Sequence, residues 1–276
     1  MIVTSNARNK QNNRMSHLKA IEKAVIKAGK ILARDFGEVE NLQVSQKGPG
    51  NFVTSSDLKV ERILIDQFQE MFPKYTIISE ERGLIEGEDD KYTIIIDPID
   101  GTTNFMHALP FFCISVALRE KLDDGTYKIV CGVTYAPALN ELFMAEEGSG
   151  AYLNDQRIEV SARNDYDDCL FAGYVAKYNG EQRKSDLQAF VKLRAQTRII
   201  GSAALEMAYV AAGKLDGMWH CNLKLWDIAA GSLLVKESRG MISEINGGDK
   251  YLDSGNIVVA NSNVFEKLRE RLVQCY

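Results

Sequence analysis

The sequence predicts a mixed α/β fold, in the α+β sense that helices and strand meanders both occur along one chain. Three observations support this prediction. Amphipathic helical patterns fill residues 16–36 and 57–71. Short apolar runs between residues 92 and 145 follow one another with few helical patterns between them, which is typical of a strand meander. From residue 201 onward, helical patterns and strands alternate.

The first two predicted helices rest on apolar residues that recur at helical spacing. In residues 16–36, one face is formed by Leu18, Ile21, Val25, Ala28, Ile31 and Leu32. Gly37 favours an end to this helix, and residues 41–50 are rich in turn formers. Residues 54–57 supply N-capping side chains for the second helix, which ends before Pro73.

The remaining elements follow as a meander and then as alternating helices and strands. The expected strands cover residues 75–79, 92–96, 112–119, 127–135, 141–145, 215–219 and 256–260. The expected helices cover residues 201–213, 226–237 and 262–273. Residues 82–91 are expected to form a charged loop, and no linker divides the chain into independent domains.

Composition and charge are those of an ordinary globular protein. The chain has 276 residues, 45% of them apolar, and 33 basic against 38 acidic residues give a formal net charge of −5. This balance argues against a nucleic-acid-binding surface, which usually carries a basic excess. No apolar run approaches the roughly 18 residues needed to cross a bilayer, so no membrane contact is expected.

The N-terminal residues lack the apolar core of a signal peptide, which predicts a cytoplasmic location. Residues 1–14 are expected to be a disordered polar tail, and Met15 is an alternative translation start because it begins a stronger helical pattern. The five cysteines are scattered and form no CxxC pair, so they are expected to be free, buried thiols. The three histidines are too dispersed to indicate a histidine metal site.

Acidic residues recur where an apolar segment ends. Asp97 and Asp100 follow one predicted strand, and Glu80 follows another. Pro98 fixes its own φ angle and restricts Asp97, so the turn between the two aspartates is expected to be rigid. Burying carboxylates is costly unless something pairs with them. Rigid, convergent oxygen ligands suit a hard cation such as Mg²⁺.

Further polar residues extend this pattern. Asp57 and Asp227 lie at predicted helix starts, where an acidic residue taken alone is explained by the helix dipole. Gly101, Thr102 and Thr103 come directly after the paired aspartates. If a short helix begins there, its first N–H groups form an anion site, and the glycine lets a ligand approach the backbone. Carboxylates holding a metal beside amides holding a phosphate would balance both charges.

With these residues in view, the chain resembles the inositol monophosphatase family. The segment DPIDGTTNF, residues 97–105, is similar to the first signature of that family, and WDIAAGSLLVKESRG, residues 226–240, resembles the second. The segments FVTSSD, SEE and GSAALEMAYVAAGKLDG occur in the expected order, at residues 52–57, 79–81 and 201–217. The resemblance covers the chain from about residue 16 to the end.

The resemblance implies a layered αβαβα sandwich of the inositol monophosphatase and fructose-1,6-bisphosphatase type. Residues 15–276 would form one phosphatase domain, with subdomains at about 15–150 and 151–276. The implied activity is Mg²⁺-dependent hydrolysis of a small phosphorylated polyol, with myo-inositol monophosphate as the leading candidate, by direct attack of a metal-activated water. The resemblance also implies a lithium-sensitive homodimer.

Metal-ligand roles carry over by position. By resemblance, the first Mg²⁺ would be held by Glu80, Asp97 and the carbonyl of Ile99. The second would be held by Asp97, Asp100 and Asp227. A third, weaker ion would use Glu80 and water, which makes two to three Mg²⁺ per subunit.

The implied catalytic residues are Asp57, Thr102 and Glu80, with the threonine hydroxyl orienting the attacking water and Asp57 lying behind it. The resemblance further implies a set of phosphate and substrate contacts. These are Asp100, Gly101, Thr102, Thr103, Gly201, Ser202, Ala203 and His220.

His220 departs from the pattern of the family. Seven residues before Asp227, inositol-hydrolysing members commonly carry a glutamate that touches substrate hydroxyls. An imidazole ring donates or accepts hydrogen bonds, whereas a carboxylate only accepts them. Two alternatives therefore stay open: His220 lines the pocket or points aside. The departure also leaves related sugar, histidinol or nucleotide phosphatase activities as alternative functions.

Two other functions are each indicated by one feature of the sequence or of its relatives. A haloacid-dehalogenase-type phosphatase requires two aspartates with one residue between them, whereas Asp97 and Asp100 have two between them. Residues 248–253 match a later element of that class, GDxxxD, but are expected to be a surface turn. Some bacterial relatives also serve transcription and ribosome maturation, so contact with RNA polymerase or transcription factors is a second candidate function.

Overall fold

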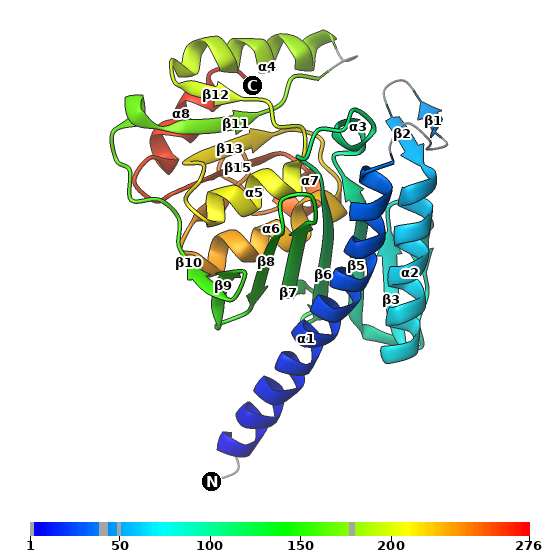
Figure 1. The fold of residues 1–276 in the computed structure, drawn as a ribbon. Coiled ribbons are helices and arrows are strands. Elements are labelled where there is room, and N and C mark those ends of the chain that lie inside the picture. Colours follow the sequence, from blue (N-terminus) through cyan, green and yellow to red (C-terminus); the bar gives the residue numbers. More distant parts are fainter. Residues whose placement is uncertain (1–2, 39–43, 49–50, 177–179) are drawn as a thin grey trace.

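Five layers of helices and sheets build the protein (Figure 1). The structure is a computed structural model that describes residues 3–38, 44–48, 51–176 and 180–276. In order, the layers are a helix pair, a large sheet, a second helix pair, a smaller sheet and an outer helix pair. The predicted αβαβα sandwich is therefore confirmed.

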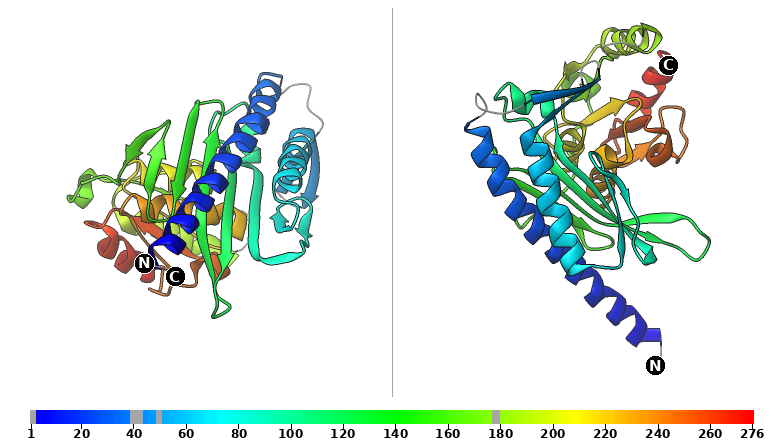
Figure 2. Two further views of the ribbon diagram at one scale, coloured as in Figure 1. Left: turned by 90° about the horizontal axis from the view of Figure 1, so that it is seen from below. Right: turned by 90° about the vertical axis from the view of Figure 1, so that its right-hand side faces the viewer.

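The first layer consists of α1 (Val3–Phe36) and α2 (Ser55–Met71), which pack side by side on the large sheet (Figure 2). The second helix is as predicted, but the first begins well before residue 16. Its early turns carry no apolar stripe, so periodicity does not detect them. β1 (Val44–Gly48) lies in the region expected to be rich in turns, and its hairpin with β2 (Asn51–Thr54) was not predicted. The tail at residues 1–14 and the two subdomains stay predictions.

The large sheet has eight strands in the order β10-β9-β8-β7-β6-β5-β3-β4. Its strands are β3 (Tyr75–Ser79), β4 (Gly83–Ile85), β5 (Asp89–Asp100), β6 (Cys113–Lys121), β7 (Tyr127–Ala136), β8 (Glu141–Glu146), β9 (Gly150–Leu153) and β10 (Gln156–Ile158). In β5, Ile94 and Ile96 face the first helix layer, and Ile95 faces the second. Residues 82–91 were wrongly expected to be a loop, because they contain β4 and the start of β5.

The second helix pair, α5 (Ala203–Ala211) and α6 (Leu225–Glu237), lies between the two sheets. The smaller sheet has the order β12-β11-β13-β15-β14. Its strands are β11 (Leu170–Gly173), β12 (Gln196–Arg198), β13 (Gly217–His220), β14 (Met241–Ser243) and β15 (Ile257–Ala260). The outer helices are α4 (Gly180–Leu193) and α8 (Phe265–Val273), and three short helices complete the fold: α3 (Thr102–Met106), η2 (Tyr166–Asp168) and α7 (Tyr251–Ser254).

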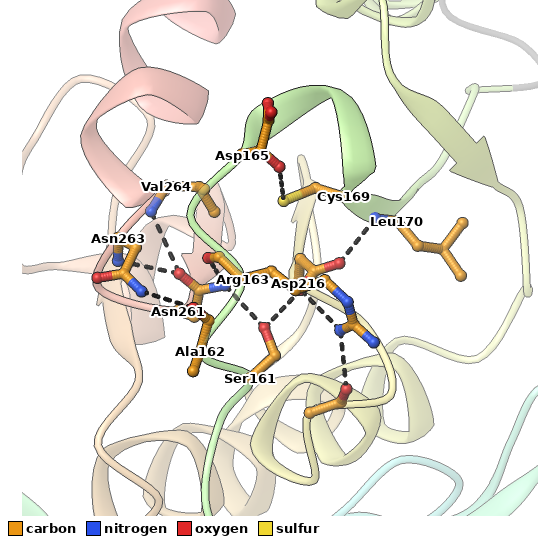
Figure 3. Close-up of polar contacts among 11 residues, drawn as sticks. Ser161, Ala162, Arg163, Asp165, Cys169, Leu170, Asp216, Asn261, Asn263 and Val264 are labelled. Carbon is orange, nitrogen blue, oxygen red and sulfur yellow. Dashed lines mark hydrogen bonds and ion pairs between the residues drawn. The ribbon is translucent and has the colours of Figure 1, made fainter.

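A buried aspartate anchors the segment that connects the two sheets (Figure 3). Asp216 is fully buried and accepts hydrogen bonds from the Ser161 hydroxyl, at 2.5 Å, and from the Leu170 amide, at 2.8 Å. The guanidinium of Arg163 lies 3.0 Å from the same carboxylate. The crossover chain is thus tied to the start of β11 and to the turn before β13.

All five cysteines are free thiols, as predicted, although Cys221 is only partly buried. In the part of the chain that the structure describes, no helix is long and apolar enough to span a bilayer.

Candidate active site

Three aspartates from two distant elements meet at one end of the large sheet. Asp97 and Asp100 lie at the end of β5, and Asp227 lies in the first turn of α6. One carboxylate oxygen of each lies within 4.8 Å of the other two. Within the described ranges, this is the single group of three or more His, Cys, Asp or Glu side chains with such spacing. The structure therefore brings together three of the predicted metal ligands.

The three carboxylates repel one another. Burial raises the pKa of Asp97 well above its usual range, and the charges of Glu80 and the other aspartates raise it further. Burial and the charge of Asp227 raise the pKa of Asp100 to about 7, although a hydrogen bond from Ser202 opposes this. The protein thus brings together carboxylates that are costly to ionise at the same time. Oxygen donors with excess negative charge fit a hard divalent cation such as Mg²⁺.

Local backbone geometry aims these carboxylates at one point. The pairing of β5 with β6 slips between Asp97, opposite Ser115, and Asp100, opposite Cys113, so the strand bulges at the Asp-Pro turn. The amide of Ile99 donates to Asp97 Oδ1 at 3.0 Å and holds that side chain in place. The hydroxyl of Ser115 donates to the Trp226 carbonyl at 3.1 Å. This bond ties the start of α6, and with it the third aspartate, to the large sheet.

Asp57 and Thr102 lie next to the aspartate cluster. Asp57 is buried in the first turn of α2, where its Oδ2 accepts the Thr54 amide at 2.8 Å in a capping box. The Thr102 hydroxyl lies 3.4 Å from Asp57 Oδ1 and 3.0 Å from the Ile99 carbonyl. Burial raises the pKa of Asp57 to about 6, against hydrogen bonds from Thr54 that lower it. The pair can therefore receive and hold a proton near neutral pH.

The predicted short helix after Gly101 is present as α3. Gly101 has a φ angle of +94°, and a Cβ atom added there would lie 2.9 Å from the Phe111 carbonyl oxygen. Only glycine fits this position without strain. The first N–H groups of a helix have no acceptor within that helix. In α3 these include the amides of Thr102 and Thr103, which follow Asp100 closely in the chain and were predicted to bind the phosphate.

Glu61 fixes the turn that carries Glu80, and sequence reasoning missed it. This carboxylate is fully buried on α2 and accepts the Ser79 hydroxyl, at 2.5 Å, and the amides of Glu81 and Arg82, at 3.1 and 3.0 Å. The amide of Glu80 donates to the Ile96 carbonyl at 3.1 Å. The signal in the sequence was an acidic residue one turn after Asp57, on the apolar face of the same helix.

We expect Glu61→Gln to raise about tenfold the Mg²⁺ concentration needed for half-maximal phosphate release. The reason is that the carboxylate accepts three hydrogen bonds from the turn that carries Glu80, a predicted Mg²⁺ ligand, and an amide would hold this turn less firmly. The variant should also lose about 1.5–3 kcal/mol of unfolding free energy. Mg²⁺ titration of activity and chemical denaturation measure the two effects. Arg82→Gln is the matched control, because it removes only an exposed partner 3.7 Å from the Glu61 carboxylate. An unchanged Mg²⁺ requirement in Glu61→Gln would contradict this role.

The predicted substrate residues beyond residue 200 lie at the start of α5 and at the end of β13. Ser202 caps α5, and its hydroxyl donates to Asp100 Oδ2 at 2.7 Å. Gly201 precedes it with a φ angle of +84°, and Ala203 begins the helix. His220 ends β13, and its ring is directed to a buried carboxylate on α5 rather than into open solvent.

One family model and several known proteins are similar to this chain. The model of the inositol monophosphatase family matches residues 14–276. An inositol-1-monophosphatase of Mesorhizobium japonicum is 43% identical over 251 residues, which are 90% of this chain and 92% of that protein. The Nus factor SuhB of Escherichia coli is 40% identical over 89% of this chain and 91% of its own length. The crystal structure of the extragenic suppressor protein SuhB from Bartonella henselae superposes with a TM-score of 0.88 at 42% identity, covering 93% of this chain and 98% of that one.

Proposed function

Because the chain belongs to the inositol monophosphatase family, a family of phosphatases, we propose that it is a Mg²⁺-dependent phosphomonoesterase of small phosphorylated polyols. Myo-inositol monophosphate is the first candidate substrate, since relatives at 43% identity are named inositol-1-monophosphatase. The observation that carries the proposal is the cluster of Asp97, Asp100 and Asp227 beside the Asp57–Thr102 pair.

In this proposal, Glu80, Asp97, the Ile99 carbonyl, Asp100 and Asp227 hold two to three Mg²⁺ ions. When bound, Mg²⁺ supplies Lewis acidity and lowers the pKa of water. The amides after β5 hold the phosphate. These contacts position the phosphoryl group and neutralise the negative charge on its oxygens, which is most of what phosphoryl transfer requires.

Asp57 and Thr102 act on the attacking water. The threonine hydroxyl accepts a hydrogen bond from the water and orients one lone pair toward phosphorus, while the hydroxyl proton points to Asp57. The water oxygen forms the new P–O bond, Asp57 takes one water proton through Thr102, and the bond from phosphorus to the alcohol oxygen breaks. The departing alkoxide takes a proton from solvent water, so the products are the free alcohol and phosphate. A pKa of Asp57 near 6 suits this acceptor at neutral pH.

The test is phosphate release from myo-inositol 1-phosphate across a Mg²⁺ titration. Parallel wells contain fructose 1,6-bisphosphate, histidinol phosphate and phosphoadenosine phosphate. We expect Mg²⁺-dependent release, greatest with the inositol ester, and inhibition by Li⁺. Sedimentation of the same sample tests the proposed homodimer. Release from none of the four esters by folded protein would refute the proposed activity.

A second function is a contact with transcription machinery, because relatives at 40% identity are named Nus factors. Pull-down of RNA polymerase by the tagged protein at moderate salt tests this contact. Retained binding by a catalytically inactive variant would separate it from the phosphatase activity. Absence of polymerase from the pull-down in both proteins would argue against it.

A further inference from the structure

A buried ion pair joins His220, one of the predicted substrate residues, to Glu206 of α5. His220 Nε2 lies 2.6 Å from Glu206 Oε2, and the two side chains are 5% and 0% exposed. Burial lowers the pKa of the His220 ring, but the charge of Glu206 and its hydrogen bond more than offset this, so the pKa is raised. The aspartates of the acidic cluster act in the same direction. The ring therefore keeps its proton to a higher pH than a free imidazole does.

The same carboxylate also holds the turn before α5. Its Oε1 accepts the amides of Ile200, at 3.2 Å, and Gly201, at 3.1 Å. Asn104 of α3 donates to the Ile200 carbonyl at 2.8 Å, which ties this turn to the segment after Asp100. One buried side chain therefore connects the end of β13, the start of α5 and the predicted phosphate-binding turn.

The His220 ring is held on its face as well as on its edge. Tyr174, directly after β11, stacks on it with a centroid distance of 5.8 Å and an interplanar angle of 12°. β11 and β13 are parallel neighbours, so both rings stand at the carboxyl ends of adjacent strands. Such strand ends are where α/β sheets bind ligands. A ring fixed on two sides presents one defined surface to a bound molecule.

We propose that Glu206 is a positioning residue of this active site, which fixes the His220 ring and the Ile200–Gly201 turn as the wall for the polyol part of the substrate. This inference rests on the proposed phosphatase function and adds the residue that holds the predicted substrate contacts His220 and Gly201 in place. A leaving group without hydroxyls, such as 4-nitrophenol, has nothing to offer this wall beyond its bulk. The ratio of kcat/KM for a polyol ester to kcat/KM for 4-nitrophenyl phosphate therefore measures what this wall contributes to recognition of the polyol.

The first test is Glu206→Gln, assayed with myo-inositol 1-phosphate and with 4-nitrophenyl phosphate. We expect kcat/KM for the inositol ester, relative to the nitrophenyl ester, to fall about tenfold or more, mainly through KM. Asp216→Asn is the matched control, because Asp216 is an equally buried carboxylate with hydroxyl, amide and cationic partners (Figure 3), and it precedes β13 whereas His220 ends that strand. It should lower stability and leave the ratio unchanged. Equal losses with both esters in Glu206→Gln would overturn the proposal.

A second readout needs no turnover. The chain has three histidines, so nitrogen-15 NMR resolves their imidazole signals, and His220→Gln assigns one of them. Glu206→Gln should shift the His220 signals toward the neutral ring, and Glu206→Asp should shift them less. Unshifted signals would refute the positioning role. If the wild-type protein hydrolyses none of the esters, the phosphatase proposal fails, whereas a shifted His220 signal in Glu206→Gln would still support the fixed ring.

Discussion

Asp97→Asn should abolish turnover while leaving the fold intact. Asp97 is the buried member of the acidic cluster, so the substitution removes a charge from the point where the carboxylates converge. We expect phosphate release to fall about a thousandfold or more, the upper range for loss of one transition-state contact. Without Mg²⁺, the variant should unfold at a higher temperature than the wild type, because one source of repulsion is gone.

The two halves of this prediction separate a catalytic from a structural role. Activity is measured by phosphate release, and stability by thermal unfolding with a chelator and with excess Mg²⁺. Asp216→Asn serves again as the buried control, and it should lower the unfolding temperature with little effect on catalysis. Wild-type activity in Asp97→Asn would remove Asp97 from the metal site. A lower unfolding temperature without Mg²⁺ would mean that this carboxylate is stabilised by the protein itself.

Patterns in the sequence predicted those parts of the fold and of the site that depend on residues close together in the chain. The three consecutive isoleucines at residues 94–96 helped to predict a strand, which the structure contains as part of β5, and the structure places this strand between two helix layers. The short helix considered after Gly101 is present, whereas the bulge between Asp97 and Asp100 was not predicted. The approach of Asp227 depends on packing between α6 and the large sheet. A periodic pattern describes neighbours along the chain and cannot predict that Asp227 meets Asp97 and Asp100. Only the resemblance to a family indicated this contact.

The missed elements carry weak patterns. α4 buries only Asp186, Ala189 and Leu193, and β4, β12 and β14 are three residues long. Segments this short or this polar lack the repeats on which pattern reading depends. The sequence also left open whether the His220 ring lines the pocket or points aside. The direction of the ring is decided by Glu206, which reaches the ring from α5 rather than from a neighbouring position in the chain.

Stability of the metal-free protein should fall as pH rises from about 4 to about 7. The pKa of Asp100 is raised to about 7 in the folded protein, and the pKa of Asp97 is raised as well. Over this pH window the unfolded chain has released these protons while the folded chain still holds them, so each rise in pH favours unfolding. His220 acts in the same direction, because its raised pKa stabilises the protonated fold at low pH and that stabilisation is lost as the ring deprotonates.

Mg²⁺ should reverse this dependence, because the ion binds the ionised carboxylates and displaces their protons. We expect Mg²⁺ to raise the unfolding temperature more near pH 8 than near pH 5, with proton release on binding near pH 6. Thermal unfolding with a chelator or with excess Mg²⁺, together with calorimetry in buffers of different ionisation enthalpy, measures both effects. Asp100→Asn should weaken the pH dependence, because one titrating carboxylate is removed. Equal stabilisation by Mg²⁺ at both pH values would mean that the ion binds elsewhere, since a site built from these aspartates must compete with protons.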